Sequence, residues 1–111
     1  MSHETRKGYV AEAAVVAALA ELGNVYRPRT TSHQATDTGD VAGLPMVFSV
    51  KNHLRMDLAA WVDEMIAMVG RSPHATGVVV HKRRGKGKAG DWYVTTSLDL
   101  LLPLLRAYIS K

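Results

Sequence analysis

Apolar residues recur at helical spacing over the first part of the chain. Residues 4–22 are mostly good helix formers, and the apolar positions among them fall about one helical turn apart. These positions are Val15, Ala18, Leu19 and Leu22. Gly23 follows them, and glycine is common at the end of a helix. The pattern therefore predicts a helix over residues 4–22.

Short runs of apolar and β-branched residues follow, and such runs are typical of strands. They cover residues 24–29, 41–44, 46–51, 76–81 and 91–95. Only a tight turn at Pro45 separates the second run from the third, so these two runs predict a hairpin. The polar residues 30–38 predict a mobile loop before that hairpin.

Two further helices are predicted in the second half of the chain. Asp57 can cap the first of them, and Gly70 marks its end. The apolar stripe of this helix consists of Leu58, Trp61, Val62, Met65 and Val69. Ser97 can cap the second helix, which runs to Ile109 and contains Pro103, a residue that can kink it.

In order, the predicted elements read α-β-β-β-α-β-β-α. Such a series predicts an α/β fold in which helices flank a mixed β-sheet. The chain has 111 residues, which is a common length for one domain. No repeat or linker interrupts the sequence, so we expect a single domain over residues 1–111.

Composition narrows the class of protein. The chain is 47% hydrophobic and 22% charged, which is typical of folded soluble proteins. The absence of cysteine excludes a disulfide framework and a thiolate zinc site, and it fits the cytoplasm. No apolar run reaches the roughly 20 residues that span a bilayer, and the start lacks the apolar segment of a signal peptide. The net charge of +4 favours a polyanionic partner.

An acidic and a basic residue flank the predicted hairpin. Asp40 stands at the start of its first run, and Lys51 ends the second, although residues 46–48 are strongly apolar. Taken singly, Asp40 is typical of a turn and Lys51 of an exposed strand end. Together they are also the groups of a metal-dependent phosphodiesterase. There, a carboxylate binds a divalent cation and a lysine steadies the attacking water or the phosphate.

Most of the chain resembles the PD-(D/E)XK nuclease superfamily, and within it the small Holliday junction resolvases of archaea and phages. Lys7-Gly8 followed by Glu12 resembles the start of the resolvase first helix, which supplies a glutamate. Gly39-Asp40-Val41 resembles the metal-binding aspartate, and residues 47–52 resemble the strand that carries the acid-X-Lys element. Residues 61–64 and 78–83 also resemble the phage members.

The resemblance implies a restriction-endonuclease-like fold, a metal site and a catalytic lysine. Asp40, Glu12 and the backbone carbonyl of Val50 would bind Mg²⁺, or Mn²⁺ in its place. Lys51 would orient the attacking water or help to deprotonate it. A resolvase cuts two strands symmetrically, so a homodimer with one site in each subunit is implied. Candidates for its interface are the last helix, Trp61 and Trp92.

One position departs from the family pattern. Ser49 stands two residues before the lysine, where the family usually has Glu or Asp. A serine hydroxyl brings no negative charge and is a poorer ligand for Mg²⁺ than a carboxylate. The loss of that acid weakens metal binding unless another carboxylate replaces it.

Three interpretations of this departure remain open. In the first, Glu64 on the following helix supplies the missing acid, as in restriction enzymes that carry a Ser-X-Lys strand; weaker candidates are Asp57 and Asp63. In the second, Asp40, Glu12 and waters hold one weakly bound ion. In the third, the protein binds DNA and no longer cuts it.

Basic and hydroxyl residues predict contacts with DNA. Residues 82–88 contain five cations, and two glycines let this backbone follow a row of phosphates. The cations are Lys82, Arg83, Arg84, Lys86 and Lys88. Arg27 and Arg29 would extend the positive surface. In the resolvase resemblance, Ser32, with Thr31 as its alternative, contacts the phosphate backbone near the cut; His33 is a further candidate phosphate contact.

The function that follows is a Mg²⁺-dependent endodeoxyribonuclease, a Holliday junction resolvase that cuts branched DNA. The resemblance implies a phage origin and the cytoplasm of the host. One alternative is a nicking or repair nuclease of the same fold. Another is a non-catalytic protein that binds DNA structures and has lost the acid at position 49. A third is a structural protein with no role on nucleic acid.

Overall fold

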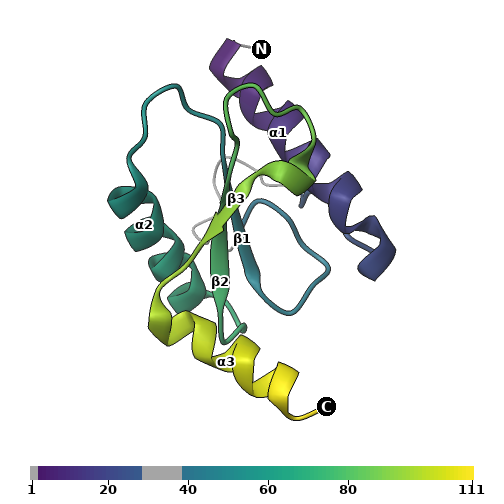
Figure 1. Ribbon diagram of the computed structural model, residues 1–111, viewed down its shortest axis with the longest axis vertical. Coiled ribbons are helices and arrows are strands. Elements are labelled where there is room, and N and C mark those ends of the chain that lie inside the picture. Colours follow the sequence, from purple (N-terminus) through teal and green to yellow (C-terminus); the bar gives the residue numbers. More distant parts are fainter. Residues whose placement is uncertain (1–2, 29–38) are drawn as a thin grey trace.

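The computed structural model describes residues 3–28 and 39–111 (Figure 1). Its helices are α1 (His3–Leu19), α2 (Leu58–Arg71) and α3 (Leu98–Ile109). Its strands are β1 (Val47–Lys51), β2 (Gly77–His81) and β3 (Tyr93–Thr95). Two short 3₁₀ turns, η1 (Ala20–Leu22) and η2 (Ala89–Asp91), complete the elements. The architecture is thus an α/β fold with a mixed sheet, and this part of the predicted fold class is confirmed.

The three strands form one sheet in the order β1-β2-β3. β1 and β2 are parallel, with Phe48 opposite Val78 and Lys51 opposite His81. β3 runs antiparallel to β2 and places Tyr93 opposite His81. Because β1 and β2 run the same way, the residues that follow Lys51 and His81 emerge at the same end of the sheet.

Alternation along β1 divides the core into two layers, and Figure 1 shows α1 and α2 on opposite sides of the sheet. Phe48 and Val50 face α1 and pack in a cluster with Ala11 and Val15. Val47 faces α2 and packs in a second cluster, together with Val79, Trp61, Met65 and Met68. Burying one such side chain contributes about 1.5–3 kcal/mol, so both layers stabilise the sheet that carries Lys51.

Two predicted strands are reduced to single pairings. Residues 24–28 and 41–44 contribute one bridge between Tyr26 and Ala42, and Val41 pairs singly with Phe48. The prediction of full strands there was wrong. Gly43 has a φ of +107°, which turns the chain out of an extended path. Pro28 also has no N–H with which to continue the pairing.

The predicted helix ends are confirmed in part. Ser97 caps α3, because its Oγ accepts a hydrogen bond from the Leu100 N–H at 3.2 Å. Asp57 precedes α2 without a side-chain cap, since its ψ of 55° departs from the extended conformation of capping residues. α2 also ends at Arg71 and not at Gly70. The next residue, Ser72, closes the helix by donating both its N–H and its hydroxyl to the Val69 carbonyl.

The buried face of α1 lies nearer its start than the predicted stripe. Ala11 and Val15 are buried, whereas Leu22 is 62% exposed. The predicted stripe of α2 is confirmed, and Met68 joins it in the core. Among the helices that the structure describes, none has the length and apolar character needed to cross a membrane.

Candidate catalytic and nucleic-acid site

Asp40 lies against the backbone of β1. Its own N–H donates to the Phe48 carbonyl at 2.7 Å, and its Oδ2 accepts from the Val50 N–H at 2.7 Å. Asp40 is half-buried at the edge of β1 that faces away from β2. These bonds hold the carboxylate next to the last residues of the strand, which a turn aspartate bonded only to its own loop would not reach.

The pairing of β1 also fixes where the Val50 carbonyl points. The N–H and C=O of one residue in a strand point to the same edge, and successive residues alternate between edges. The Lys51 carbonyl accepts from the Lys82 N–H on the β2 side at 3.0 Å. The Val50 N–H is directed to Asp40, so the Val50 carbonyl is directed to the same edge as the Asp40 carboxylate.

Lys51 and Glu64 meet across the interface between β1 and α2. Lys51 Nζ lies 2.8 Å from Glu64 Oε1, and the side chains are 15% and 49% exposed. The structure therefore brings together the predicted catalytic lysine and the predicted replacement acid. The same ion pair explains how a lysine can end so apolar a strand, because its stem lies in the α2 layer while its ammonium reaches a partly exposed carboxylate.

Ser49 points into the same layer and is fully buried at 0% exposure. Within the described chain, its Oγ has no hydrogen-bond partner. Its neighbours Val47 and Val79 are also at 0% exposure, so the position lies inside the packed layer. Glu64 does not bond to Ser49; its recorded partner is Lys51.

Glu12 lies on α1 and forms an ion pair with Arg27. Arg27 Nε is 2.8 Å from Glu12 Oε1, and the Arg27 guanidinium stacks on the Tyr9 ring at 4.1 Å. The predicted metal ligand Glu12 and the predicted DNA contact Arg27 therefore bind each other beside α1. The remaining predicted contacts Arg29, Ser32 and His33, with the alternative Thr31, lie outside the described residues.

The donor set at the edge of β1 fits a magnesium ion in its chemistry. Residues 3–28 and 39–111 contain no group of three His, Asp or Glu side chains placed around one point. Mg²⁺ is nevertheless usually bound through one or two carboxylates, several waters and substrate phosphates. The Asp40 carboxylate and the Val50 carbonyl offer two hard oxygens at one edge, and Glu64 lies beside Lys51, the residue that follows Val50.

The basic segment after β2 is partly folded back on aromatic rings. Arg83 stacks on Tyr93 at 4.5 Å and donates to the Asp91 carbonyl, and the Lys82 ammonium lies 5.8 Å from the centre of the Trp92 ring. The chain then turns at Gly85, whose φ is +78°. Arg84, Lys86 and Lys88 are exposed. The predicted row of cations is thus a short, anchored segment with its outer charges open to a partner.

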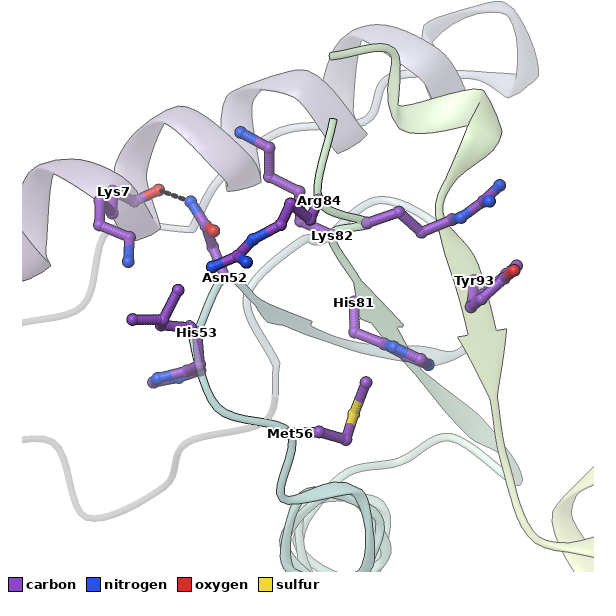
Figure 2. A pocket seen from close by; sticks show the side chains of 10 residues that line it. Lys7, Asn52, His53, Met56, His81, Lys82, Arg84 and Tyr93 are labelled. Carbon is purple, nitrogen blue, oxygen red and sulfur yellow. Dashed lines mark hydrogen bonds between the residues drawn. The ribbon is translucent and has the colours of Figure 1, made fainter. Parts of the chain in front are cut away.

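A pocket of about 480 Å³ lies where β1 and β2 end (Figure 2). We call it the strand-end pocket. Its lining comes from α1, from the segment after β1, from β2 with the segment after it, and from β3. The lining residues are Lys7, Asn52, His53, Leu54, Met56, His81, Lys82, Arg83, Arg84 and Tyr93.

Lys7, Asn52 and His81 were not predicted to bind a ligand. A sequence signal was available for Asn52 and His81, because polar residues at or directly after the ends of two parallel strands meet at one end of a sheet. Lys7 could not be found in this way, because it joins the pocket only through tertiary packing: Asn52 Nδ2 donates to the Lys7 carbonyl at 3.3 Å. Burial lowers the pKa of His81, whose Nε2 lies 2.8 Å from Thr95 Oγ1.

Comparison with protein-family models, with curated proteins and with solved structures finds no match to this chain. The fold and the site by themselves define a small α/β protein with a lysine–carboxylate pair and a cationic pocket at one end of its sheet.

Proposed function

We propose that this protein is a metal-dependent endonuclease that acts on branched DNA. The observation that carries the proposal is the grouping at the end of β1. Asp40 bonds to the Val50 amide, and the next residue, Lys51, pairs with Glu64. Two carboxylates from two other segments thus bond to adjacent residues at the end of β1, one of them the lysine, and the strand-end pocket begins at the next residue, Asn52. Carboxylates and a lysine are groups that metal-dependent phosphodiester hydrolysis uses.

The arrangement of elements supports a nuclease-like topology. A helix precedes the Asp40 segment, which pairs with β1 in an antiparallel bridge, and α2 then connects β1 to the parallel strand β2. This series agrees with the predicted order except that two of the predicted strands are only single bridges. The strand that resembles the acid-X-Lys element is β1, with Ser49 and Lys51, and it lies between the Asp40 segment and β2.

The residues of the chain divide the chemistry between them. Asp40, Glu64 and the Val50 carbonyl would hold Mg²⁺, which supplies charge stabilisation at the phosphate and a more acidic water. The Lys51 ammonium orients the attacking water and offsets the negative charge that develops on the phosphate. Glu64 holds Lys51 in place at 2.8 Å. The cations after β2 bind the phosphates on either side through contacts that do not depend on sequence.

Branched DNA has two strands to cut, so we propose a two-fold dimer. Trp61 and Trp92 are buried within the two cores at 8% and 7% exposure, so they offer little surface for it. α3 is the better candidate, because Leu98, Tyr108 and Ile109 are each more than 70% exposed. Large exposed apolar residues on one element are typical of a contact surface.

Cleavage of a synthetic four-way junction tests this function. We expect paired cuts in the junction with Mg²⁺ or Mn²⁺, and no paired cuts in a duplex of the same sequence. Lys51→Ala and Glu64→Gln should each lower the cleavage rate about 100-fold or more, because positioned groups of this kind contribute factors of that size.

Asp63→Asn is the matched control for Glu64→Gln. Asp63 is an exposed acid on the same helix, so its loss should leave the rate within about twofold. Equal rates for Glu64→Gln and Asp63→Asn would remove Glu64 from the site. Unchanged cutting by Lys51→Ala would contradict the proposed mechanism.

A second function has its own observation. Ser49 is buried and brings no carboxylate to the position two residues before Lys51, as expected of a nuclease fold that binds DNA structures without cutting them. Tight, salt-sensitive binding of the junction with no cuts under either metal would establish this function instead.

A further inference from the structure

The strand-end pocket collects positive charge from separate parts of the chain. Lys7 comes from α1, whereas Lys82, Arg83 and Arg84 follow β2. None of the described residues that line it is Asp or Glu. Figure 2 shows Lys7, Asn52, Lys82 and Arg84 gathered on one side of the pocket. Such a set favours an anion, because four cations without a carboxylate repel one another until an anion neutralises them.

Part of this set is held in place before any ligand arrives. The bond from Asn52 Nδ2 to the Lys7 carbonyl fixes the first turns of α1 against the end of β1. Arg83 is fixed by its stack on Tyr93 and its bond to the Asp91 carbonyl. Arg84 remains exposed and completes the rim. Preorganised cations lose less conformational entropy on binding than free side chains do.

The remaining lining is suited to the rest of a nucleotide. Leu54 and Met56 are exposed apolar side chains at 76% and 65%, and the Tyr93 ring is 55% exposed. Apolar and aromatic surface beside cations can accept a base or sugar while the cations take the phosphate. The volume of about 480 Å³ lies within the range of small-ligand pockets and is much smaller than a duplex requires.

We propose that the strand-end pocket binds the terminal phosphate monoester of a DNA strand, together with its first nucleotide. A monoester carries nearly two negative charges at pH 7, because its second pKa is about 6, whereas an internal diester carries one. A set of four cations around one pocket therefore favours a strand end over a passing backbone. This inference rests on the proposed action on DNA and adds the kind of DNA end that the protein retains.

The pocket also lies where a strand end would be produced. Hydrolysis of a phosphodiester adds water across one P–O bond and leaves a phosphate monoester on one end and a hydroxyl on the other. Asn52 and His53 follow Lys51 directly, and the Lys82 N–H donates to the Lys51 carbonyl. The pocket would thus hold the newly cut end while a second strand is cut.

Binding of short duplexes that differ only at one end tests this proposal. The full chain is titrated, without metal, against duplexes ending in a 5′-phosphate, a 3′-phosphate or two hydroxyls, each labelled at the far end. We expect one phosphorylated duplex to bind about tenfold tighter than the hydroxyl duplex, the effect of one or two charged hydrogen bonds. The double variant Lys7→Ala, Arg84→Ala should reduce that ratio to near one.

The matched control is the double variant Arg106→Ala, Lys111→Ala, which also removes one arginine and one lysine, but at the C-terminal end of α3 and away from the pocket. It should keep the tenfold ratio, and circular dichroism should show both variants folded. Equal binding of all three duplexes by the full chain, or an unchanged ratio in the pocket variant, overturns the proposal. A free deoxynucleoside monophosphate that binds the pocket as tightly as the duplex end overturns the assignment to strand ends.

Failure of the two proposals can be told apart. If no DNA binds at low salt, the proposed function itself fails. If junctions are bound or cut in a Lys51-dependent manner while the end-phosphate ratio stays at one, only the pocket assignment fails.

Discussion

At the scale of single residues, two side chains on the same face of β1 have different surroundings. Ser49 is sealed with an unpaired hydroxyl, whereas Lys51 reaches a carboxylate on α2. Alternation along the strand explains why both point to α2. The distance of each residue from the strand end explains the difference, because only Lys51 lies close enough to solvent for its ammonium to stay hydrated.

Removal of the Ser49 hydroxyl should stabilise the fold. An unsatisfied buried polar group costs about 1–3 kcal/mol, so Ser49→Ala should raise the free energy of unfolding by about 1 kcal/mol in urea titrations. Thr76→Val is the contrasting variant, because Thr76 Oγ1 is buried and donates to the Leu100 carbonyl. It should lose about 1 kcal/mol. A loss of stability in Ser49→Ala would show that the Ser49 hydroxyl is bonded.

Stability should fall in mild acid through His81. Burial lowers the pKa of His81 below its usual 6.5, so below pH 6.5 the unfolded chain binds more protons than the folded one. The contribution of neutral His81 to the free energy of unfolding is complete above pH 6.5. It is lost as the pH falls toward the lowered pKa of the folded state. His81→Gln should therefore show a smaller loss of unfolding free energy than the parent between pH 7.5 and pH 5.5. Parallel curves would contradict this origin.

At the scale of elements, the tight contact between β1, β2 and α2 sets the geometry of the site. Gly77 lies opposite Val47 in the parallel pair, and Val69 of α2 covers it. A Cβ at Gly77 would lie 2.8 Å from Val69 Cγ2 and 2.9 Å from Val47 Cβ. Glycine is required there because the helix and two strands approach too closely for any side chain.

Gly77→Ala should consequently be destabilising by about 1–3 kcal/mol, the usual cost of overpacking. Gly70→Ala is the control, since a Cβ at Gly70 meets nothing within 4 Å. Alanine is also the better helix former, so Gly70→Ala should stabilise by about 0.5–1 kcal/mol. Urea unfolding of both variants measures the difference, and equal effects would contradict the close packing at Gly77.

The elements differ in how well their sequence predicts them. The stripe of α2 is periodic and the run of β2 is continuously apolar, and both elements were predicted at nearly their observed bounds. Residues 24–29 and 41–44 have comparable β-forming composition, but only single bridges form among those described. Gly43 interrupts the pairing of these residues, because its φ is positive and a Cβ on it would overlap the Asn24 carbonyl. A packing contact of this kind leaves no periodic signal in the sequence.

At the scale of the whole molecule, charge is arranged unevenly around the fold. The cations of the strand-end pocket lie at the end of the sheet where Lys51 also lies. Figure 1 shows α3 at the other end of the sheet, and its Leu98, Tyr108 and Ile109 are exposed. In the proposed function, the first end contacts DNA and α3 contacts a second copy of the chain. The net charge of +4 alone does not show this separation.

The basic end should give DNA binding a steep salt dependence. Each phosphate contact contributes a slope of about −0.9 to log K against log salt. Lys88→Ala should therefore lower the magnitude of the slope by about 0.9 in junction binding measured over a salt series. Arg106→Ala, on α3, should leave the slope unchanged. Identical slopes for the parent and Lys88→Ala would place Lys88 outside the DNA-binding surface.

The sequence by itself determined the α/β class of the fold, the stripe of α2, the run of β2, the cap at Ser97 and the basic segment after β2. These features follow from periodicity, capping or composition among neighbouring residues. Asp40 and Lys51 were candidates from their places around the predicted hairpin, and Glu64 was a candidate through the resemblance to nucleases with a Ser-X-Lys strand. Only the tertiary structure decided that Lys51 meets Glu64, thirteen positions away, and that Lys7 meets Asn52 across 45 positions. It also enclosed the Ser49 hydroxyl and paired Glu12 with Arg27. The physical reason is that strand register and helix packing set these distances together, and no local pattern in the chain encodes them.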